Sequence, residues 1–140
     1  MKKIVTIFLL ISSLNVFATI EIEIQNPVIR LTPPGMTVTA MFLKIINHSN
    51  KNLKLVKVTG DFAKTFELHN MEMLDGKMKM RSVESMVLKN KATTELKSGG
   101  LHIMIFDLKA PLKEGDYQKL ELILDNKAVI EINAKVEKID

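Results

Sequence analysis

Cysteine is absent from all 140 residues of this sequence. The chain can form no disulfide, so its stability has to come from apolar burial and from sheet hydrogen bonds. Thiol chemistry and a lipid anchor attached through cysteine are excluded for the same reason. A blue-copper electron-transfer site needs a cysteine thiolate, and structural zinc sites usually contain cysteines as well. Neither kind of site can be expected here.

An excess of one charge sign is also lacking. The sequence has 20 Lys and Arg residues against 16 Asp and Glu residues, which gives a net charge of +4. Basic and acidic residues alternate along the chain and form no clustered stripe, which a nucleic-acid phosphate backbone would require. We therefore expect a solvated surface of mixed sign and no nucleic-acid partner.

Sequence features of an enzyme are scarce. The chain has no cysteine nucleophile, no second histidine near a serine that it could activate, and no glycine-rich phosphate loop. A binding protein is therefore expected rather than an enzyme.

The first 18 residues read MKKIVTIFLLISSLNVFA. Lys2 and Lys3 precede an apolar run, and Ala18 supplies the small residue that a signal peptidase requires, which is the layout of a secretory signal peptide. The run is shorter than the roughly 20 residues of a membrane-spanning helix. We expect cleavage after Ala18 and one exported domain over residues 19–140, with an uncleaved membrane anchor as the alternative.

The remaining sequence alternates with a period of two and lacks sustained helical periodicity. Expected strands cover residues 20–25, 36–46, 53–58, 65–73, 77–83, 86–88, 93–96, 101–108, 117–124 and 128–136. Turn sequences separate them, among them Thr32-Pro33-Pro34-Gly35, Asp75-Gly76 and Gly99-Gly100. Short strands with turns about every ten residues predict an all-β, antiparallel Greek-key sandwich or barrel.

Methionine is concentrated around two of the three histidines. Met71, Met73, Met78, Met80 and Met86 lie between His69 and His102, and Met104 follows. Side chains two residues apart on a strand project from the same face, so His102 and Met104 point together while Ile103 faces the core. The sequence His-x-Met therefore predicts a pair of neighbouring ligands.

The same parity applies to the first histidine. His69 shares a strand face with Met71 and Met73, and Met78 shares one with Met80 across the expected turn. A thioether sulfur is a soft, neutral donor that binds Cu(I) well and Zn(II) poorly, and imidazole binds copper in either oxidation state. Two histidines and two methionines would thus select Cu(I).

The spacing of these residues matches a known signature. His69, Met80, His102 and Met104 follow the pattern of a histidine, ten residues, a methionine, twenty-one residues, a histidine, one residue and a methionine. This pattern is specific, and the chain resembles the PCu(A)C family of periplasmic copper chaperones. The segments LHNMEMLDGKMKMR and LKSGGLHIMIFDLKAPLKEGD resemble the two ligand segments of that family.

The resemblance implies a cupredoxin-like β-sandwich in the periplasm that binds one Cu(I) through these four residues. It also implies a copper-accepting partner, either a cytochrome oxidase subunit or another copper chaperone. We expect a monomer that does not insert into the membrane after cleavage. A periplasmic protein that sequesters copper for tolerance is the alternative. The chain lacks the His- and Met-rich C-terminal tail of some members, which argues against a second copper site there.

The other candidates are assigned ordinary roles. His48 lies in a polar turn and is expected at the surface. Met71 has the parity to approach the metal, but the family pattern assigns the sulfur ligand to Met80, so Met71 is expected beside the ligands. Met73 and Met86 are assigned to packing or to the rim of the site.

Overall fold

The computed structural model describes residues 21–139, so the predicted signal peptide lies outside the described part. Residues 21–139 contain strands and turns but no helix, and hence no helix that could cross a membrane. The ten strands are β1 (Ile22–Arg30), β2 (Thr39–Asn47), β3 (Leu53–Gly60), β4 (Ala63–Leu74), β5 (Lys77–Ser82), β6 (Met86–Leu88), β7 (Ala92–Leu96), β8 (His102–Leu108), β9 (Tyr117–Leu124) and β10 (Val129–Glu137).

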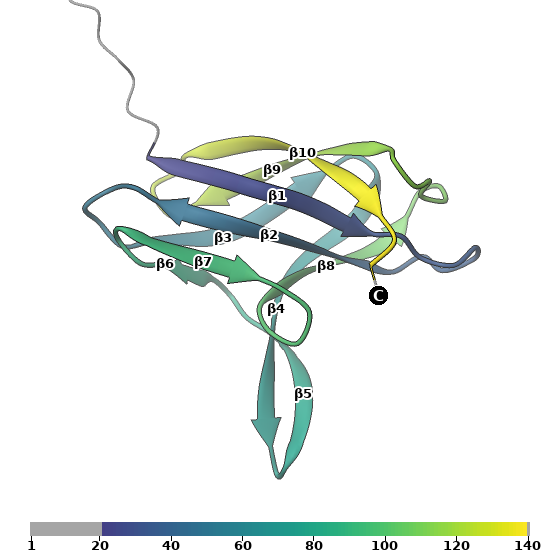
Figure 1. Cartoon of the computed structure of the whole chain (residues 1–140), viewed down its shortest axis with the longest axis horizontal. Coiled ribbons are helices and arrows are strands. Elements are labelled where there is room, and N and C mark those ends of the chain that lie inside the picture. Colours follow the sequence, from purple (N-terminus) through teal and green to yellow (C-terminus); the bar gives the residue numbers. More distant parts are fainter. Residues whose placement is uncertain (1–20, 140) are drawn as a thin grey trace, which may run out of the picture.

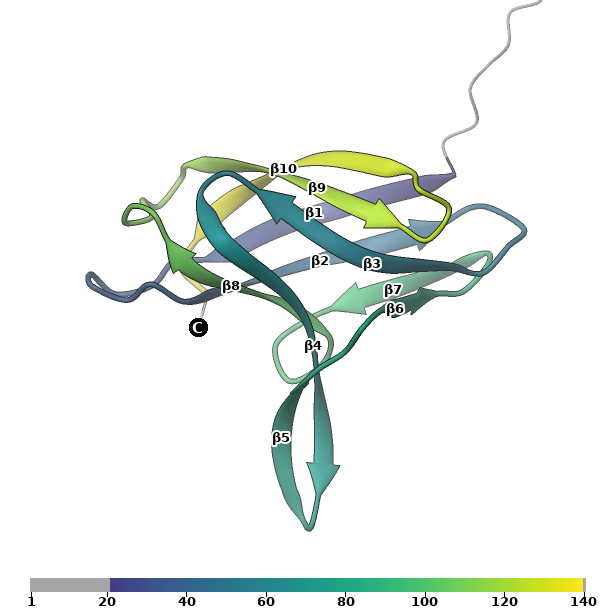
Figure 2. The same ribbon diagram turned by 180° about the vertical axis from the view of Figure 1, so that it is seen from behind.

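Hydrogen bonding links these strands in the order β5-β4-β8-β2-β1-β10-β9-β3-β6, and β7 pairs with β2. The sheet folds over on itself, so that β2 and β8 form one layer with β1 while β3, β9 and β10 form the other. Figures 1 and 2 show this body and a long hairpin of β4 and β5 that projects away from it. The all-β sandwich predicted from the sequence is confirmed.

The core lies between the two layers. Apolar side chains at alternate positions along the strands fill it. In β9 and β10, every second residue is apolar and buried, as at Leu120, Leu122 and Val136, whereas Glu121 between the two leucines is exposed. Antiparallel pairing of β9 with β10 sets Leu120 against Ile132 on the inner face. Alternate burial of this kind fixes the register, because a slip of one residue would turn every apolar side chain to water.

Two sequence expectations about the strands were wrong. The first strand does not end at Gln25 but continues to Arg30, because the register of its pairing with β2 shifts between Gln25 and Val28 and the bulge accommodates Asn26 and Pro27. The sheet is also not entirely antiparallel, since β1 pairs with β10 in parallel, with Val28 opposite Lys135.

The expected turn between β4 and β5 is confirmed. Asp75 and Gly76 both have positive φ angles, 51° and 74°. Two positive φ angles in a two-residue loop define the primed turn whose twist matches a hairpin. Met73 therefore lies opposite Met78, and Met71 lies opposite Met80.

The metal-free protein should be folded, because none of the four predicted ligands belongs to the hydrophobic core cluster. Circular dichroism of the chelator-treated protein is expected to show β-structure and a cooperative thermal transition. A random-coil spectrum that becomes ordered only on addition of copper would contradict this expectation.

Candidate metal centre

The two predicted histidine ligands lie side by side on neighbouring strands. In the antiparallel pairing of β4 with β8, His69 is directly opposite His102, and their ring centroids are 5.7 Å apart. The flanking pair, Leu68 and Ile103, points to the other face and is buried in the core. Core packing of that pair thus holds the two imidazoles together on the outer face.

His102 has one ring nitrogen in a hydrogen bond to the protein. The turn before β8 contains Gly99, whose φ of 82° is accessible at low cost only to glycine. This turn brings the carbonyl oxygen of Gly100 to 2.7 Å from Nδ1 of His102. Because a carbonyl can only accept, Nδ1 carries the hydrogen, and Nε2 keeps its lone pair in the neutral ring.

In His69 the two ring nitrogens have the opposite roles. Its Nε2 lies 2.7 Å from Oε2 of Glu67, two residues earlier on the same face of β4. The ionised carboxylate can only accept, so Nε2 donates, and the lone pair of the neutral ring is on Nδ1. That Nδ1 is buried and has no hydrogen-bond partner. A buried polar atom without a partner costs about 1–3 kcal/mol, a cost that a bound metal ion would remove.

The thioethers lie in a pocket next to these rings. The pocket has a volume of about 430 Å³, and Met71, Met80, His102 and Met104 line it. The cross-strand pairing sets Met71 opposite Met80 on the hairpin, and Met104 comes from β8. Among the described residues that line this pocket, no carboxylate occurs. Besides the hydroxyl groups of Thr32, Thr39 and Ser98, the side-chain donors there include imidazole nitrogen and thioether sulfur, and thioether sulfur suits a soft ion such as Cu(I).

Arg30 is the charged residue in the pocket lining. Its guanidinium lies over the ring of Phe42, 5.1 Å from the centroid, and contacts Oγ of Ser98 at 3.4 Å. A permanent positive charge at the wall disfavours a doubly charged ion more than a singly charged one.

The structure thus brings together most of the residues predicted from the sequence. Met80, His102 and Met104 share the pocket, whereas His69 is not among its lining residues, and its ring centroid lies 5.7 Å from that of His102. The histidines are buried, with exposed fractions of 9% for His69 and 5% for His102. Met80 is 50% exposed, so the sulfur side of the site is open.

The remaining candidates lie where their sequence context indicated or close to it. His48 is at the surface, where its Nε2 contacts Oε2 of Glu23 at 2.8 Å. Hydrogen bonds from Gln25 and from this histidine lower the pKa of Glu23. Met86 is 2% exposed and belongs to the core. Met71 lines the pocket with Met80, His102 and Met104, beside the predicted ligands as the sequence indicated.

Glu67 was not identified by sequence reasoning. The sequence did contain a signal for it. Residues two apart on a strand share a face, and Glu67 lies two residues before His69, just as Met71 lies two residues after it. A histidine that binds a metal almost always donates its other N–H to a carboxylate or a carbonyl. Glu67 and the carbonyl of Gly100 make these two contacts here.

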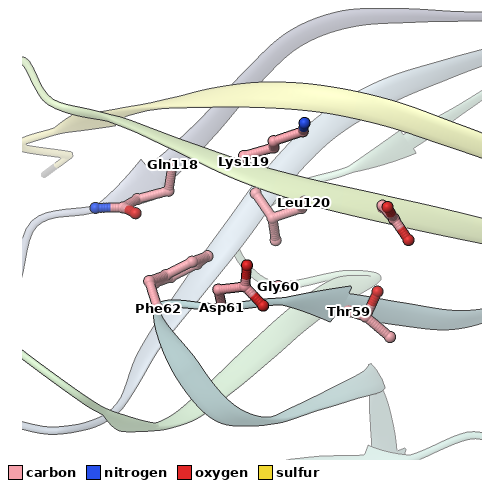
Figure 3. A pocket seen from close by; sticks show the side chains of 8 residues that line it. Thr59, Gly60, Asp61, Phe62, Gln118, Lys119 and Leu120 are labelled. Atoms are coloured by element: carbon pink, nitrogen blue, oxygen red, sulfur yellow. The ribbon is translucent and has the colours of Figure 1, made fainter.

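A different pocket lies away from these histidines and methionines. It has a volume of about 520 Å³ between the end of β3 and the start of β9, and Figure 3 shows the side chains that line it, including Asp61, Phe62, Gln118 and Lys119. A hydrogen bond to Glu131 raises the pKa of Lys119. Since its lining contains neither histidine nor methionine, this pocket is not a candidate for soft-metal binding.

The fold is that of PCuAC domains, which confirms both the cupredoxin-like sandwich and the family resemblance predicted from the sequence. The copper-bound PCuAC domain from PmoF2 superposes with a TM-score of 0.73 and 18% identity over 88% of this chain and 97% of that domain. The solution structure of Cu(I)-DR1885 from Deinococcus radiodurans gives a TM-score of 0.65 and 28% identity over 81% of this chain and 76% of that one.

The family model described as "Putative lipoprotein LpqE-like" matches residues 22–136. The chain therefore belongs to the LpqE-like family. A curated relative, the uncharacterized protein RP573 of Rickettsia prowazekii (strain Madrid E), is 29% identical over 99 residues, or 70% of this chain. The match spans 55% of that relative's length.

Replacing Glu67 by Ala should weaken Cu(I) binding by about 10–100-fold, the usual effect of losing the partner of a metal-binding histidine. Glu67→Gln retains an acceptor for Nε2–H and should bind close to normally. The second readout needs no metal: ¹⁵N NMR of the apo protein should show the hydrogen of His69 on Nε2, and Glu67→Ala should lose this preference. Tighter copper binding by Glu67→Ala would instead mean that the carboxylate blocks the site.

Proposed function

We propose that this chain is a periplasmic copper chaperone that binds one Cu(I) and delivers it to a copper-accepting protein. The proposed ligands are His69 through Nδ1, His102 through Nε2, and the sulfurs of Met80 and Met104. The acceptor we propose is the copper centre of a cytochrome oxidase subunit or a second copper chaperone. The leader at residues 1–18 would direct export and would be removed, leaving a monomeric carrier.

The observation that carries this proposal is the hydrogen bonding of the two histidines. Each ring donates one N–H to a protein acceptor, so each keeps one nitrogen for a metal ion, and the rings are 5.7 Å apart beside a pocket lined with thioethers. Neutral nitrogen and sulfur donors favour Cu(I) over hard dications. The copper-bound domain of PmoF2 and Cu(I)-DR1885, which share this fold, support the choice of metal.

The uneven exposure of the donors suits transfer rather than permanent storage. The histidines are buried and fixed by hydrogen bonds, whereas Met80 is half exposed on the projecting hairpin. An acceptor's ligand can reach the ion from this side and replace one sulfur at a time while the nitrogens still hold it. Cu(I) keeps its charge throughout, so the exchange needs no electron donor.

Titration in competition with a Cu(I) chelator should give one Cu(I) per chain and no comparable affinity for Zn(II), because half of the donors are thioethers. His102→Ala should weaken Cu(I) binding by more than the roughly 10–100-fold expected for a lost hydrogen-bond partner. Met80→Leu and Met104→Leu delete only the sulfur and should weaken binding while sparing the fold.

Met86→Leu is the matched control for these variants. It removes a thioether from the buried core rather than from the pocket, so Cu(I) affinity should not change. Zinc that displaces copper at equal concentration would contradict the four-ligand site.

Transfer itself is tested by mixing the Cu(I)-loaded protein with the soluble copper domain of an oxidase subunit and following the metal by spectroscopy. We expect copper to appear on the oxidase domain. Retention of copper by the chain when the acceptor has the higher affinity would favour a protein that sequesters copper for tolerance.

A further inference from the structure

One face of the projecting hairpin carries only methionine among its apolar side chains. Met71 is paired with Met80, and Met73 is paired with Met78 one step closer to the tip. Strand alternation puts all four on the face that also carries His69. We call these two pairs the methionine ladder. Its inner pair lines the pocket of the proposed copper site, and its outer pair extends beyond that pocket.

The outer pair is not explained by packing. Met73 is 63% exposed and Met78 is 49% exposed, and every residue of β5 is exposed. Apart from Leu74 next to the turn, the opposite face of the hairpin is polar, and it carries an ion pair of 3.0 Å between Arg81 and Glu72. The ladder is thus an apolar stripe in water, which costs free energy unless something binds there.

The choice of residue points to sulfur chemistry. A strand face that served only for apolar docking would favour β-branched and aromatic residues, which suit strands better than unbranched side chains. Methionine accounts for 9 of the 140 residues, yet it occupies all four of these positions. Thioether sulfur is the donor that separates methionine from leucine or isoleucine, and it binds soft ions such as Cu(I).

We propose that the methionine ladder is a second, weaker Cu(I) site through which the ion enters and leaves the histidine pocket. Directly opposed residues have Cβ atoms about 4.5–5.5 Å apart, and the flexible methionine side chain lets sulfurs from both pairs reach one ion. The site rests on the proposed function, because it shares Met71 and Met80 with the pocket. Since these sulfurs are shared, the two positions are filled in turn and not together.

Movement between the positions is ligand exchange. One Cu–S bond to the outer pair breaks as one bond to a pocket donor forms, and the ion stays Cu(I) with neutral ligands throughout. The outer position lacks imidazole nitrogen, so it holds copper more weakly than the pocket does. The increase in affinity towards the histidines favours entry, and an acceptor that binds Cu(I) more tightly than the pocket reverses the movement.

The test uses full-length mature protein labelled with ¹³C at the methionine methyl groups and titrated with Cu(I) under anaerobic conditions. In a His102→Gln/Met104→Leu variant, which disables the pocket, residual binding should shift the methyl signals of Met73 and Met78. Adding either Met73→Leu/Met78→Leu or Met73→Ser/Met78→Ser should then reduce the residual affinity at least tenfold. Leucine keeps the apolar face and serine removes it, so equal losses identify sulfur as the cause.

The outcomes separate this proposal from the function on which it rests. Wild-type protein that binds no Cu(I) would overturn the proposed function. If the wild type binds Cu(I) but the Met73 and Met78 signals do not shift in the pocket variant, only the ladder is wrong. Residual affinity kept by the leucine pair and lost by the serine pair would indicate an apolar docking face instead. Should the pocket variant fail to fold, His102→Gln alone is titrated in its place, and unchanged Met73 and Met78 signals there would overturn the ladder.

Discussion

The antiparallel register between β4 and β8 determines both the core and the metal centre. Leu68 meets Ile103 on the inner face, and the next pair along, His69 and His102, meets on the outer face. Because strand side chains alternate, a slip of one residue would put imidazoles into the core and leucine into the pocket. The free energy of burying the apolar pair therefore also positions the two imidazoles.

The two halves of the centre differ in rigidity for a structural reason. The histidines lie where the hairpin joins the sandwich, and each has one nitrogen fixed by a hydrogen bond. Met80 lies further out, on a strand without a buried residue, and its side chain has three rotatable bonds. Preorganised nitrogens lower the entropy lost on binding, whereas adaptable sulfurs lower the barrier to exchange. A carrier needs both properties, and in the proposed site the imidazoles on β4 and β8 supply the first while Met80 on β5 supplies the second.

The features that the sequence predicted correctly are those that depend on local geometry within a strand or a turn. The pair His102 and Met104 could be identified because residues two apart on any strand share a face, and the Asp75-Gly76 turn set the hairpin register. The parallel pairing of β1 with β10 could not be predicted, since it joins the two ends of the domain and depends on the completed sandwich. Burial of the histidines was missed for a similar reason, because it arises from the neighbouring strand rather than from their own.

The charged groups near the proposed site add to the preference of its neutral donors for a singly charged ion over a dication. Four neutral ligands leave the charge of a bound ion uncompensated, and a charge in a low-dielectric site is costly. The carboxyl group of Glu67, hydrogen-bonded to His69, is the nearest acidic group to the proposed nitrogen donors on its strand face, and its side chain is 41% exposed. Arg30 adds a positive charge at the pocket wall. In the proposed site a dication would meet twice the repulsion from Arg30 that a singly charged ion meets, and the described residues of the pocket lining include no carboxylate to offset it.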